Sequence, residues 1–434
     1  MTEDIFTNED KKFMELALKI AEKGRGTTRP NPLVGAVITD GIKFISSGYH
    51  KMAGLPHAEI EAIKNAGKYF NGSMPAGLKM YVTLEPCSIY GKTPPCTDAI
   101  IKGEFSEIII SMLDPNPKVN GNGVLKLREA GIKVKSGLLE EKAKIQNEVF
   151  ITHTTKRRPF ICAKIASTID GKTATSTGDS KWITSNRSRN LVQKLRFDYG
   201  CVLTGINTVL KDNPFLYPKK KLTGSVGSKG INSYFDSTIL RNLITKKIII
   251  ENDDGKKEII NFSNFYRIIL DSNLNIPLDS NIIRSTKQIK TIIFFAKKNK
   301  DNLKDKINML ADSGSILIDI ESTEKGLLDL NEVLYHLYND FEITSIMLEC
   351  GPALLTSFLR QDLIDKYIFF MAPKIIGADS PYSIFSDLKI NSIEDCKKIS
   401  FKNVKKVGED ILIEGYDVYG DNNRARKNKK NFKN

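Results

Sequence analysis

A histidine and two cysteines in the first quarter of the chain are residue types that bind zinc. These residues are His57, Cys87 and Cys96. Zinc in proteins is usually four-coordinate, so three side chains leave one position for water. Zinc lowers the pKa of a bound water from about 15.7 to about 7, which provides a nucleophile at neutral pH. Glu59 lies two residues after the histidine, so we expect it to reach that water and act as a catalytic proton carrier.

The residues around these positions indicate which class of zinc enzyme the site belongs to. His57-Ala58-Glu59 and Pro86-Cys87 match the H-x-E…P-C-x-x-C pattern of zinc nucleobase deaminases. The second cysteine departs from that pattern, because eight residues instead of two separate Cys87 from Cys96. Ordinary core residues would need neither a proline before each cysteine nor an acid at this offset from the histidine. A structural zinc site would require a fourth ligand, and the neighbouring sequence offers no convincing one.

Length and composition indicate a multidomain protein of the cytoplasm. A chain of 434 residues exceeds what one ordinary core accommodates, so two domains are expected. The N-terminus is polar and acidic, unlike a signal peptide, and no apolar run reaches the roughly 18 residues of a membrane span. Six irregularly spaced cysteines do not form a disulfide framework. We therefore expect a cytoplasmic enzyme that does not contact a membrane.

Part of the net charge of +14 is concentrated in one segment at the end of the sequence. Residues 421–434 contain six Lys or Arg and one Asp, so this tail alone carries 6 − 1 = +5. Such polar, charged ends are usually disordered. The remaining +9 suits an anionic small substrate or cofactor as well as a polynucleotide.

Apolar periodicity in the first half predicts a mixed sheet with helices on its faces. Helices are expected at 8–23, from His57, from Cys96, at 123–130 and at 139–153, and strands at 33–38, up to Tyr49, at 80–84, 106–111 and 131–136. Asn31 and Asp114 fall near strand ends, where ligands bind in α/β sheets. Ordinary Asx turns would explain both residues equally well.

His57-Ala58-Glu59 together with the segment Glu85-Pro86-Cys87-Ser88 to Thr93-Pro94-Pro95-Cys96 resembles the deaminase half of the bifunctional riboflavin-biosynthesis deaminase–reductase family. The resemblance implies a cytidine-deaminase-like three-layer domain. It also implies zinc on the three residues above and Glu59 as proton shuttle. Contacts to a pyrimidine ribosyl-phosphate are implied at Asn31, His50, Lys92, Asp114 and Asn116.

The second half begins after a polar hinge, Lys156 to Pro159, and also reads as α/β. Strands are expected at 160–166, 201–205 and 345–349, and helices at 186–197 and from Asn207. The turn at Gly351-Pro352 would suit a phosphate, although the residues alone favour a purely structural turn. No G-x-G-x-x-G stands between a strand and a helix, so a standard Rossmann fold is unsupported.

Four motifs of this half resemble the reductase half of the same family: Ala166-Ser167-x-x-Asp170-Gly171-Lys172, Ser180-x-Trp182-Ile183-Thr184, Asp212-Asn213-Pro214 and Glu349-x-Gly351-Pro352. The resemblance implies a dihydrofolate-reductase-like α/β domain that uses NADPH. The residues implied to line the cofactor are Ala166, Trp182, Thr208, Asp212, Gly351, Pro352, Ala353, Leu354, Leu355, Thr356 and Ser357. Those implied to face the ribose-phosphate substrate are Ser180, Arg196, Leu216, Lys219 and Glu349.

Three departures from the family pattern stand out. Ile89 occupies a position where the family usually has His, and Lys219 one where it usually has Arg. Lys keeps the charge but loses the two-pronged phosphate geometry of Arg. Residues 219–265 form a Lys, Asn and Ile-rich insertion in which 248–250 and 259–260 are expected to pair as a hairpin.

The domain hypothesis is therefore a zinc-dependent deaminase at 1–155, an NADPH-dependent reductase at 156–420 and a basic disordered tail at 421–434. The functional hypothesis is deamination of a diaminopyrimidine ribosyl-phosphate followed by NADPH reduction of its ribosyl group, in a homo-oligomer formed through the reductase domain. No nucleic-acid partner is expected. Two alternatives remain: a nucleic-acid-editing deaminase whose basic tail contacts the backbone, and a zinc-stabilised binding protein in which Glu59 is dispensable.

Overall fold

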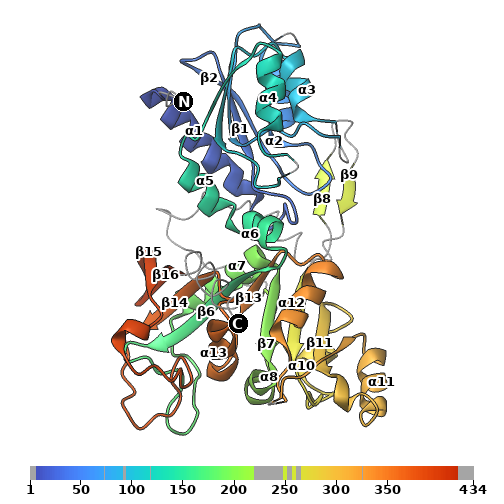
Figure 1. The fold of residues 1–434 in the computed structure, drawn as a ribbon, viewed down its shortest axis with the longest axis vertical. Helices are drawn as coiled ribbons and strands as arrows, with labels where there is room; N and C mark the ends of the chain where they lie inside the picture. Colours follow the sequence, from blue (N-terminus) through green and yellow to red (C-terminus); the bar gives the residue numbers. More distant parts are fainter. Residues whose placement is uncertain are drawn as a thin grey trace, which may run out of the picture. The chain divides into compact units, whose positions relative to one another are not determined.

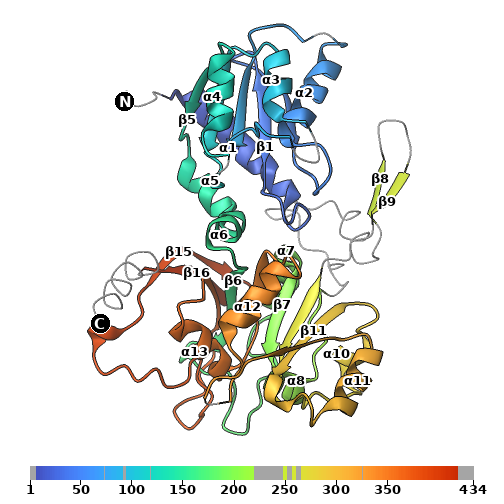
Figure 2. The same cartoon turned by 45° about the vertical axis from the view of Figure 1, so that its right-hand side comes forward.

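The computed structural model describes residues 6–72, 74–90, 94–117, 119–218, 248–251, 257–260, 265–324 and 326–418. The chain forms two compact units that divide between Arg158 and Pro159, inside the expected polar hinge. Each unit has its own sheet and its own hydrophobic core (Figures 1 and 2). Within the described residues, no helix has the length and apolar character needed to cross a membrane.

The first unit contains a five-stranded mixed sheet in the order β2-β1-β3-β4-β5. Its strands are β1 (Gly35–Thr39), β2 (Phe44–Tyr49), β3 (Lys79–Leu84), β4 (Glu107–Met112) and β5 (Lys133–Ser136). β1 pairs antiparallel with β2 and β3, whereas β3, β4 and β5 are parallel. The carboxyl ends of β3 and β4 consequently lie side by side, which brings the loop that holds Cys87 next to the loop that holds Asp114.

Two glycines allow helices to pack closely on both faces of this sheet. A Cβ at Gly35 would lie 2.2 Å from a backbone oxygen of α1 (Asn8–Ala21). A Cβ at Gly48 would lie 2.3 Å from a backbone oxygen of α2 (Ala58–Tyr69). Gly48 is paired with Ala36, the neighbour of Gly35, and successive residues of a strand point to opposite faces. The two helices therefore cover opposite faces, which confirms the three-layer arrangement.

The other helices of this unit are η1 (Glu22–Gly24), α3 (Cys96–Lys102), α4 (Asn122–Glu129), α5 (Glu140–Gln146) and α6 (Glu148–Lys156). The single helix expected at 139–153 is wrong, because the helix is interrupted at Asn147. The buried amide of Asn147 accepts from the backbone N–H of Leu33 at 2.8 Å and donates to the Leu33 carbonyl at 3.0 Å. A side chain that bonds a distant backbone in this way competes with continued helix geometry.

The second unit contains a nine-stranded sheet in the order β12-β11-β10-β7-β13-β6-β14-β16-β15. The strands are β6 (Phe160–Thr168), β7 (Cys201–Gly205), β10 (Tyr266–Leu270), β11 (Lys290–Ala296), β12 (Ile316–Ile320), β13 (Ser345–Leu348), β14 (Lys366–Ala372), β15 (Ile399–Val407) and β16 (Asp410–Asp417). All are parallel except β15 and β16, which run antiparallel at one edge. The strands expected at 160–166, 201–205 and 345–349 are confirmed.

The helices of the second unit are α7 (Asn186–Tyr199), α8 (Ile206–Asp212), α10 (Asn281–Arg284), η2 (Lys297–Asn299), α11 (Lys304–Asp312), α12 (Leu330–Asn339), α13 (Pro352–Arg360) and η3 (Ile393–Asp395). The α/β character expected of this half is confirmed. β13 lies between β6 and β7, so the segments that follow these strands meet near the middle of the sheet.

The expected hairpin within residues 219–265 is also confirmed. β8 (Ile248–Glu251) pairs antiparallel with β9 (Lys257–Ile260) in a separate two-stranded sheet. The residues between β8 and β9, the rest of this insertion apart from Phe265, and the basic tail at 421–434 lie outside the described residues.

Candidate active sites

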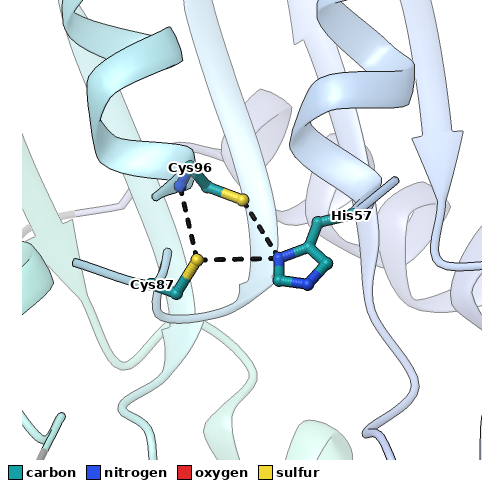
Figure 3. A group of neighbouring side chains, drawn as sticks. All are labelled: His57, Cys87 and Cys96. Carbon is teal, nitrogen blue, oxygen red and sulfur yellow. Dashed lines mark hydrogen bonds between the residues drawn. The ribbon is translucent and has the colours of Figure 1, made fainter. Parts of the chain in front are cut away.

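The zinc-ligand candidates converge at the ends of three elements of the first unit (Figure 3). His57 is the residue that caps the start of α2, Cys96 is the first residue of α3, and Cys87 lies in the loop after β3. The Nδ1 atom of His57 lies 3.2 Å from the sulfur of Cys96 and 3.6 Å from the sulfur of Cys87. The backbone N–H of Cys96 donates to the sulfur of Cys87 at 3.3 Å.

This donor set fits a zinc ion. The three candidate ligand atoms all lie within 4.8 Å of one another. Tetrahedral zinc, with bonds of about 2.3 Å to sulfur and about 2.0 Å to nitrogen, separates neighbouring ligand atoms by roughly 3.5 to 3.8 Å. The observed nitrogen–sulfur separations are close to that range, so small side-chain shifts are enough to accommodate the metal.

The three groups change one another's protonation. Hydrogen bonding to Cys96 and to His57 lowers the pKa of the Cys87 thiol to about 4, although burial opposes this. The pKa of Cys96 is raised, because its thiol hydrogen-bonds to Cys87 and is buried. The hydrogen bond with Cys87 raises the pKa of His57. One sulfur is thus readily a thiolate, the form in which cysteine binds metal.

Glu59 stands in the first turn of α2 with its carboxyl beside both sulfurs. The side chain is only 3% exposed. Burial and the neighbouring Cys87 charge raise the pKa of Glu59 to about 7. A carboxyl group that gains and loses a proton near neutrality is suited to general acid–base catalysis.

Asn31 and His50, both named from the sequence, are brought together beside the His57–Cys87–Cys96 cluster. The Asn31 amide nitrogen donates to Nε2 of His50 at 3.0 Å, and Nδ1 of His50 lies 3.2 Å from the Pro56 carbonyl. These partners assign the proton of a neutral His50 to Nδ1, since a carbonyl can only accept. Burial lowers the pKa of His50, which favours that neutral form. The His50 and His57 rings meet edge to face, with centroids 5.4 Å apart.

Asp114 and Asn116 follow β4 on the neighbouring loop. The backbone N–H of Asn116 donates to the Asp114 carboxylate at 2.8 Å, and both residues are half-buried. Burial raises the pKa of Asp114, and the nearby charges of Glu85 and Cys87 add to the effect. Lys92 lies outside the described residues.

In the second unit, Arg196 and Glu349 form a two-pronged ion pair. The Nε and Nη2 atoms of Arg196, on α7, lie 2.6 and 3.0 Å from the two carboxylate oxygens of Glu349, which directly follows β13. Lys164 on β6 places its ammonium 3.4 Å from the same carboxylate. Burial alone would raise the pKa of Glu349, but the charges of Arg196 and Lys164 lower it to about 2.

The loop after α8 supports this ion pair. The Tyr217 carbonyl accepts from Arg196 at 3.4 Å, and Leu216 is buried with a left-handed backbone φ of 49°. Ser180, in the loop before α7, is exposed, and Lys219 lies outside the described residues.

A fully buried arginine, Arg267 on β10, anchors the same loop. Burial lowers the pKa of Arg267 to about 10. Its guanidinium donates to uncharged oxygens only, namely the hydroxyls of Ser285 and Thr291 and the carbonyls of Phe215, Ile282 and Ile289. The bond to Phe215 fixes the residue that precedes Leu216.

The residues expected to line the cofactor occupy several elements. Ala166 lies on β6, Thr208 and Asp212 lie on α8, and residues 351–357 form the turn and first turns of α13. Among the described residues, Gly351 has no neighbouring atom within 4 Å of where a Cβ would stand, so they leave the approach to this helix start open. Leu355 and Thr356, in contrast, are buried in the packing of α13.

Trp182 lies apart in the loop before α7 and is 66% exposed, with the Arg189 guanidinium 4.2 Å from its ring centre. It lines a hollow of about 630 Å³ together with Arg187, Arg189 and Lys374. Glu409 and Asp410 also line the hollow, so its three cationic side chains exceed its two acidic ones by one.

Two residues at these sites escaped the sequence analysis. Lys164 stands between two apolar residues in Ala163-Lys164-Ile165. A single lysine inside an otherwise apolar strand was the only sequence feature that could have indicated a functional role. Glu85 lies within the Glu85-Pro86-Cys87 motif and is 3% exposed. No sequence pattern revealed the partners of either residue.

Both halves of the chain match known protein families. The cytidine and deoxycytidylate deaminase zinc-binding region matches residues 7–112, and the RibD C-terminal domain matches residues 159–413. "Riboflavin biosynthesis protein RibD" of Aquifex aeolicus is 40% identical, with 93% of this chain and 97% of the relative covered. The protein of the same name from Escherichia coli is 33% identical, with 93% and 98% covered.

Solved structures agree over the same span. Acinetobacter baumannii RibD (form 1) superposes with a TM-score of 0.73 at 29% identity, covering 94% of this chain and 99% of the other. A diaminohydroxyphosphoribosylaminopyrimidine deaminase/5-amino-6-(5-phosphoribosylamino)uracil reductase of Thermotoga maritima gives 0.71 at 32% identity with the same coverage. Neither of the two alternative hypotheses, a nucleic-acid-editing deaminase or a zinc-stabilised binding protein, explains the presence of a reductase half. The chain belongs to the RibD family of bifunctional deaminase–reductases of riboflavin biosynthesis.

Proposed function

We propose that the chain deaminates 2,5-diamino-6-ribosylamino-4(3H)-pyrimidinone 5′-phosphate and then reduces the ribosyl group with NADPH, giving 5-amino-6-(5-phosphoribitylamino)uracil. The observation that carries the first step is the convergence of three zinc-ligand atoms within 4.8 Å, with the buried Glu59 carboxyl beside them. The name of the Thermotoga maritima relative supports this choice of substrate.

In the deamination, His57, Cys87 and Cys96 would hold zinc, and the bound metal would supply a water of lowered pKa as the nucleophile for the amine-bearing ring carbon. Glu59 accepts a proton from the attacking water and passes it to the ring nitrogen. It then accepts the proton of the newly added hydroxyl group and passes it to the amine, which leaves as ammonia while the ring carbonyl forms. Asn31, paired with His50, binds the pyrimidine and its ribose-phosphate together with Asp114 and Asn116, which follow β4, and Lys92, which lies between Cys87 and Cys96 in the sequence.

In the reduction, bound NADPH would supply the hydride for C1 of the opened ribosyl group. Arg196, Ser180, Leu216 and Lys219 hold the ribose-phosphate substrate. Glu349 fixes the guanidinium of Arg196 through the two-pronged ion pair, and its low pKa keeps it charged.

The open start of α13 at Gly351 suits a phosphate of the cofactor, because the first N–H groups of a helix lack internal partners. The cationic side chains beside Trp182 offer a second place where an anionic group of the cofactor can bind. Ala166, Thr208, Asp212 and residues 351–357 are the cofactor contacts that we propose.

A coupled assay tests both steps. Purified chain with the pyrimidine ribosyl-phosphate should release one ammonia and oxidise one NADPH per substrate molecule. The same reaction with NADH instead of NADPH tests cofactor choice. Ammonia release without NADPH oxidation would contradict the second step, and release from a single-stranded oligonucleotide alone would contradict the substrate.

Mixing two inactive variants sharpens that assay. Glu59→Gln should stop the first step only and Glu349→Gln the second, so a mixture should regain both if the intermediate is released into solution. Glu61→Gln, on the same helix as Glu59 and ion-paired with Lys51, is the matched control. No recovery in the mixture would indicate direct transfer between sites of one chain.

We further propose the domain limits 1–155 and 156–420, a cytoplasmic location and a homo-oligomer formed through the reductase domain. All six cysteines are free, as zinc-binding thiolates require. β15 at the sheet edge exposes Phe401 (59%) and Val404 (58%), apolar surface that a second copy would cover. Light scattering should give a mass above 48.6 kDa, and Phe401→Lys should lower it.

A further inference from the structure

Glu85 is a buried carboxylate to which the proposed reaction gives no role. It directly follows β3 and precedes Pro86 and the zinc-ligand candidate Cys87. Its side chain is 3% exposed and it has no cationic partner among the residues that the structure describes. A carboxylate in such a position requires strong hydrogen-bond donors.

Four backbone N–H groups satisfy Glu85. One carboxylate oxygen accepts from Gly123 at 2.9 Å and from Val124 at 3.3 Å. The other accepts from Asp114 at 3.1 Å and from Gly121 at 3.0 Å. These donors match the roughly four lone-pair sites of a carboxylate, and hydrogen bonds to a charged acceptor are about twice as strong as neutral ones.

All four donors belong to one stretch of chain, the segment from the end of β4 to the first turn of α4. This segment carries Asp114 and Asn116, the proposed substrate contacts. Glu85 therefore connects that segment to the chain that holds Cys87, at a point only two residues from the metal ligand.

A second close contact joins the same two segments. A Cβ at Gly123 would lie 2.2 Å from the carbonyl oxygen of Pro86 and 3.1 Å from the Glu85 carboxylate. The first turn of α4 thus packs directly on the peptide before Cys87, and only glycine permits this approach. The hydrogen bonds and this packing together fix the distance between the zinc cluster and the substrate segment.

We propose that Glu85 is a positioning residue for deamination, which sets the Asp114–Asn116 segment at the correct distance from the zinc centre. The inference depends on the proposed function, because that assigns the segment to the substrate. Glu85 itself does not touch the substrate. Displacing a substrate contact by about 1 Å can cost on the order of 10²-fold in catalytic efficiency, so we expect this geometry to decide how well the substrate is held.

Glu85→Gln tests the proposal. Glutamine offers one acceptor oxygen, and its NH₂ group would face two N–H donors, so half of the segment loses its anchor. We expect the KM for the pyrimidine ribosyl-phosphate to rise about 10- to 100-fold, the range typical of lost supporting contacts. The kcat should change less, zinc should stay near one per chain, and NADPH oxidation with the deaminated substrate should stay unchanged.

Three companion variants separate positioning from general stability. Glu85→Asp keeps the charge and should recover part of the lost affinity. Gly123→Ala leaves the carboxylate intact but pushes α4 away from Pro86, so it should raise KM in the same way. Glu129→Gln makes the same chemical change at an exposed position of α4 and should have no effect.

The result that overturns the proposal is an unchanged KM in both Glu85→Gln and Gly123→Ala, or zinc lost in proportion to activity in both Glu85 variants. A wild-type chain that releases no ammonia from this substrate would instead refute the proposed function. An active wild-type chain with unchanged KM in the variants refutes the role of Glu85 alone.

Discussion

Two buried glutamates, one in each unit, have opposite electrostatic environments. Glu59 is 3% exposed, and burial together with Cys87 raises its pKa to about 7. Glu349 is 8% exposed, yet Arg196 and Lys164 outweigh its burial and lower its pKa to about 2. The two residues are almost equally buried, so the charges around them and not their burial decide the direction of the shift.

The difference between the two pKa values corresponds to two chemical roles, proton transfer and the orientation of charged partners. A carboxyl for which burial and the Cys87 charge outweigh the opposing effect of His57 can exchange a proton near neutrality, as catalysis of deamination requires. A carboxylate between two cations keeps its charge and orients its partners. Zinc bound beside Glu59 adds positive charge and lowers the pKa of that carboxyl, so the value near 7 describes the metal-free site.

Removal of the metal should produce the largest difference between the activities of the two sites. We expect a strong chelator to reduce ammonia release to background while NADPH oxidation with the deaminated substrate continues, because the described part of the chain has a group of candidate metal ligands in the first unit only. Added zinc should restore ammonia release. A parallel loss of both activities would mean that the second site also depends on the metal.

Glu59→Gln removes the proton carrier and keeps the size of the side chain. Ammonia release should fall by about 10²- to 10⁴-fold, the usual contribution of general acid–base catalysis. Zinc content should remain near one per chain, as measured by metal analysis. Glu61→Gln should behave like the wild type, and equal losses in the two variants would rule out a specific role of Glu59.

Glu349→Gln leaves Arg196 and Lys164 buried without their counter-charge. Breaking one partner of a buried ion pair typically costs about 3 to 5 kcal/mol, so the second unit should unfold at a lower urea concentration. Trp182 is the only tryptophan of the chain, and its fluorescence follows this unit alone.

The exposed Glu394 provides the control, since Glu394→Gln should leave the unfolding midpoint unchanged. If Glu349→Gln abolishes reduction without moving the midpoint, the carboxylate acts in the reaction itself and not as a structural partner.

The smallest effect is the pH dependence of stability. The pKa of Glu349 falls from 4.5 to about 2 on folding, a difference of 4.5 − 2 = 2.5. Its contribution, on the order of 3 kcal/mol, is present above the unfolded pKa and is lost as pH falls through the folded pKa. The difference in unfolding free energy between wild type and Glu349→Gln should therefore shrink by roughly half or more from pH 7 to pH 3. A difference that stays constant would contradict the low pKa.

Local patterns in the sequence predicted the elements and the residue types of the zinc cluster. His57 and Cys96 stand at helix starts and Cys87 after a strand, as periodicity and the Pro-Cys pairs indicate. Lys164 and Glu85 could not be predicted in the same way. Lys164 reaches Glu349 only because β6 pairs with β13, and Glu85 binds backbone groups of a segment far along the chain.

The broken helix at Asn147 teaches the same lesson. Its sequence reads as one helix, and only the distant backbone of Leu33 interrupts it. Contacts with backbone groups leave no trace in side-chain types, so they are invisible to pattern analysis. The roles of the proposed substrate and cofactor residues stay predictions until they are measured.

The buried guanidinium of Arg267 should make the heat tolerance of the reductase half depend on a single side chain. Its donors hold the loop before Leu216, and Arg267→Lys would replace five of them by three and leave carbonyls in the interior unpaired. On warming, such a chain should lose reduction first, and a cell that relies on it would accumulate the deaminated but unreduced compound.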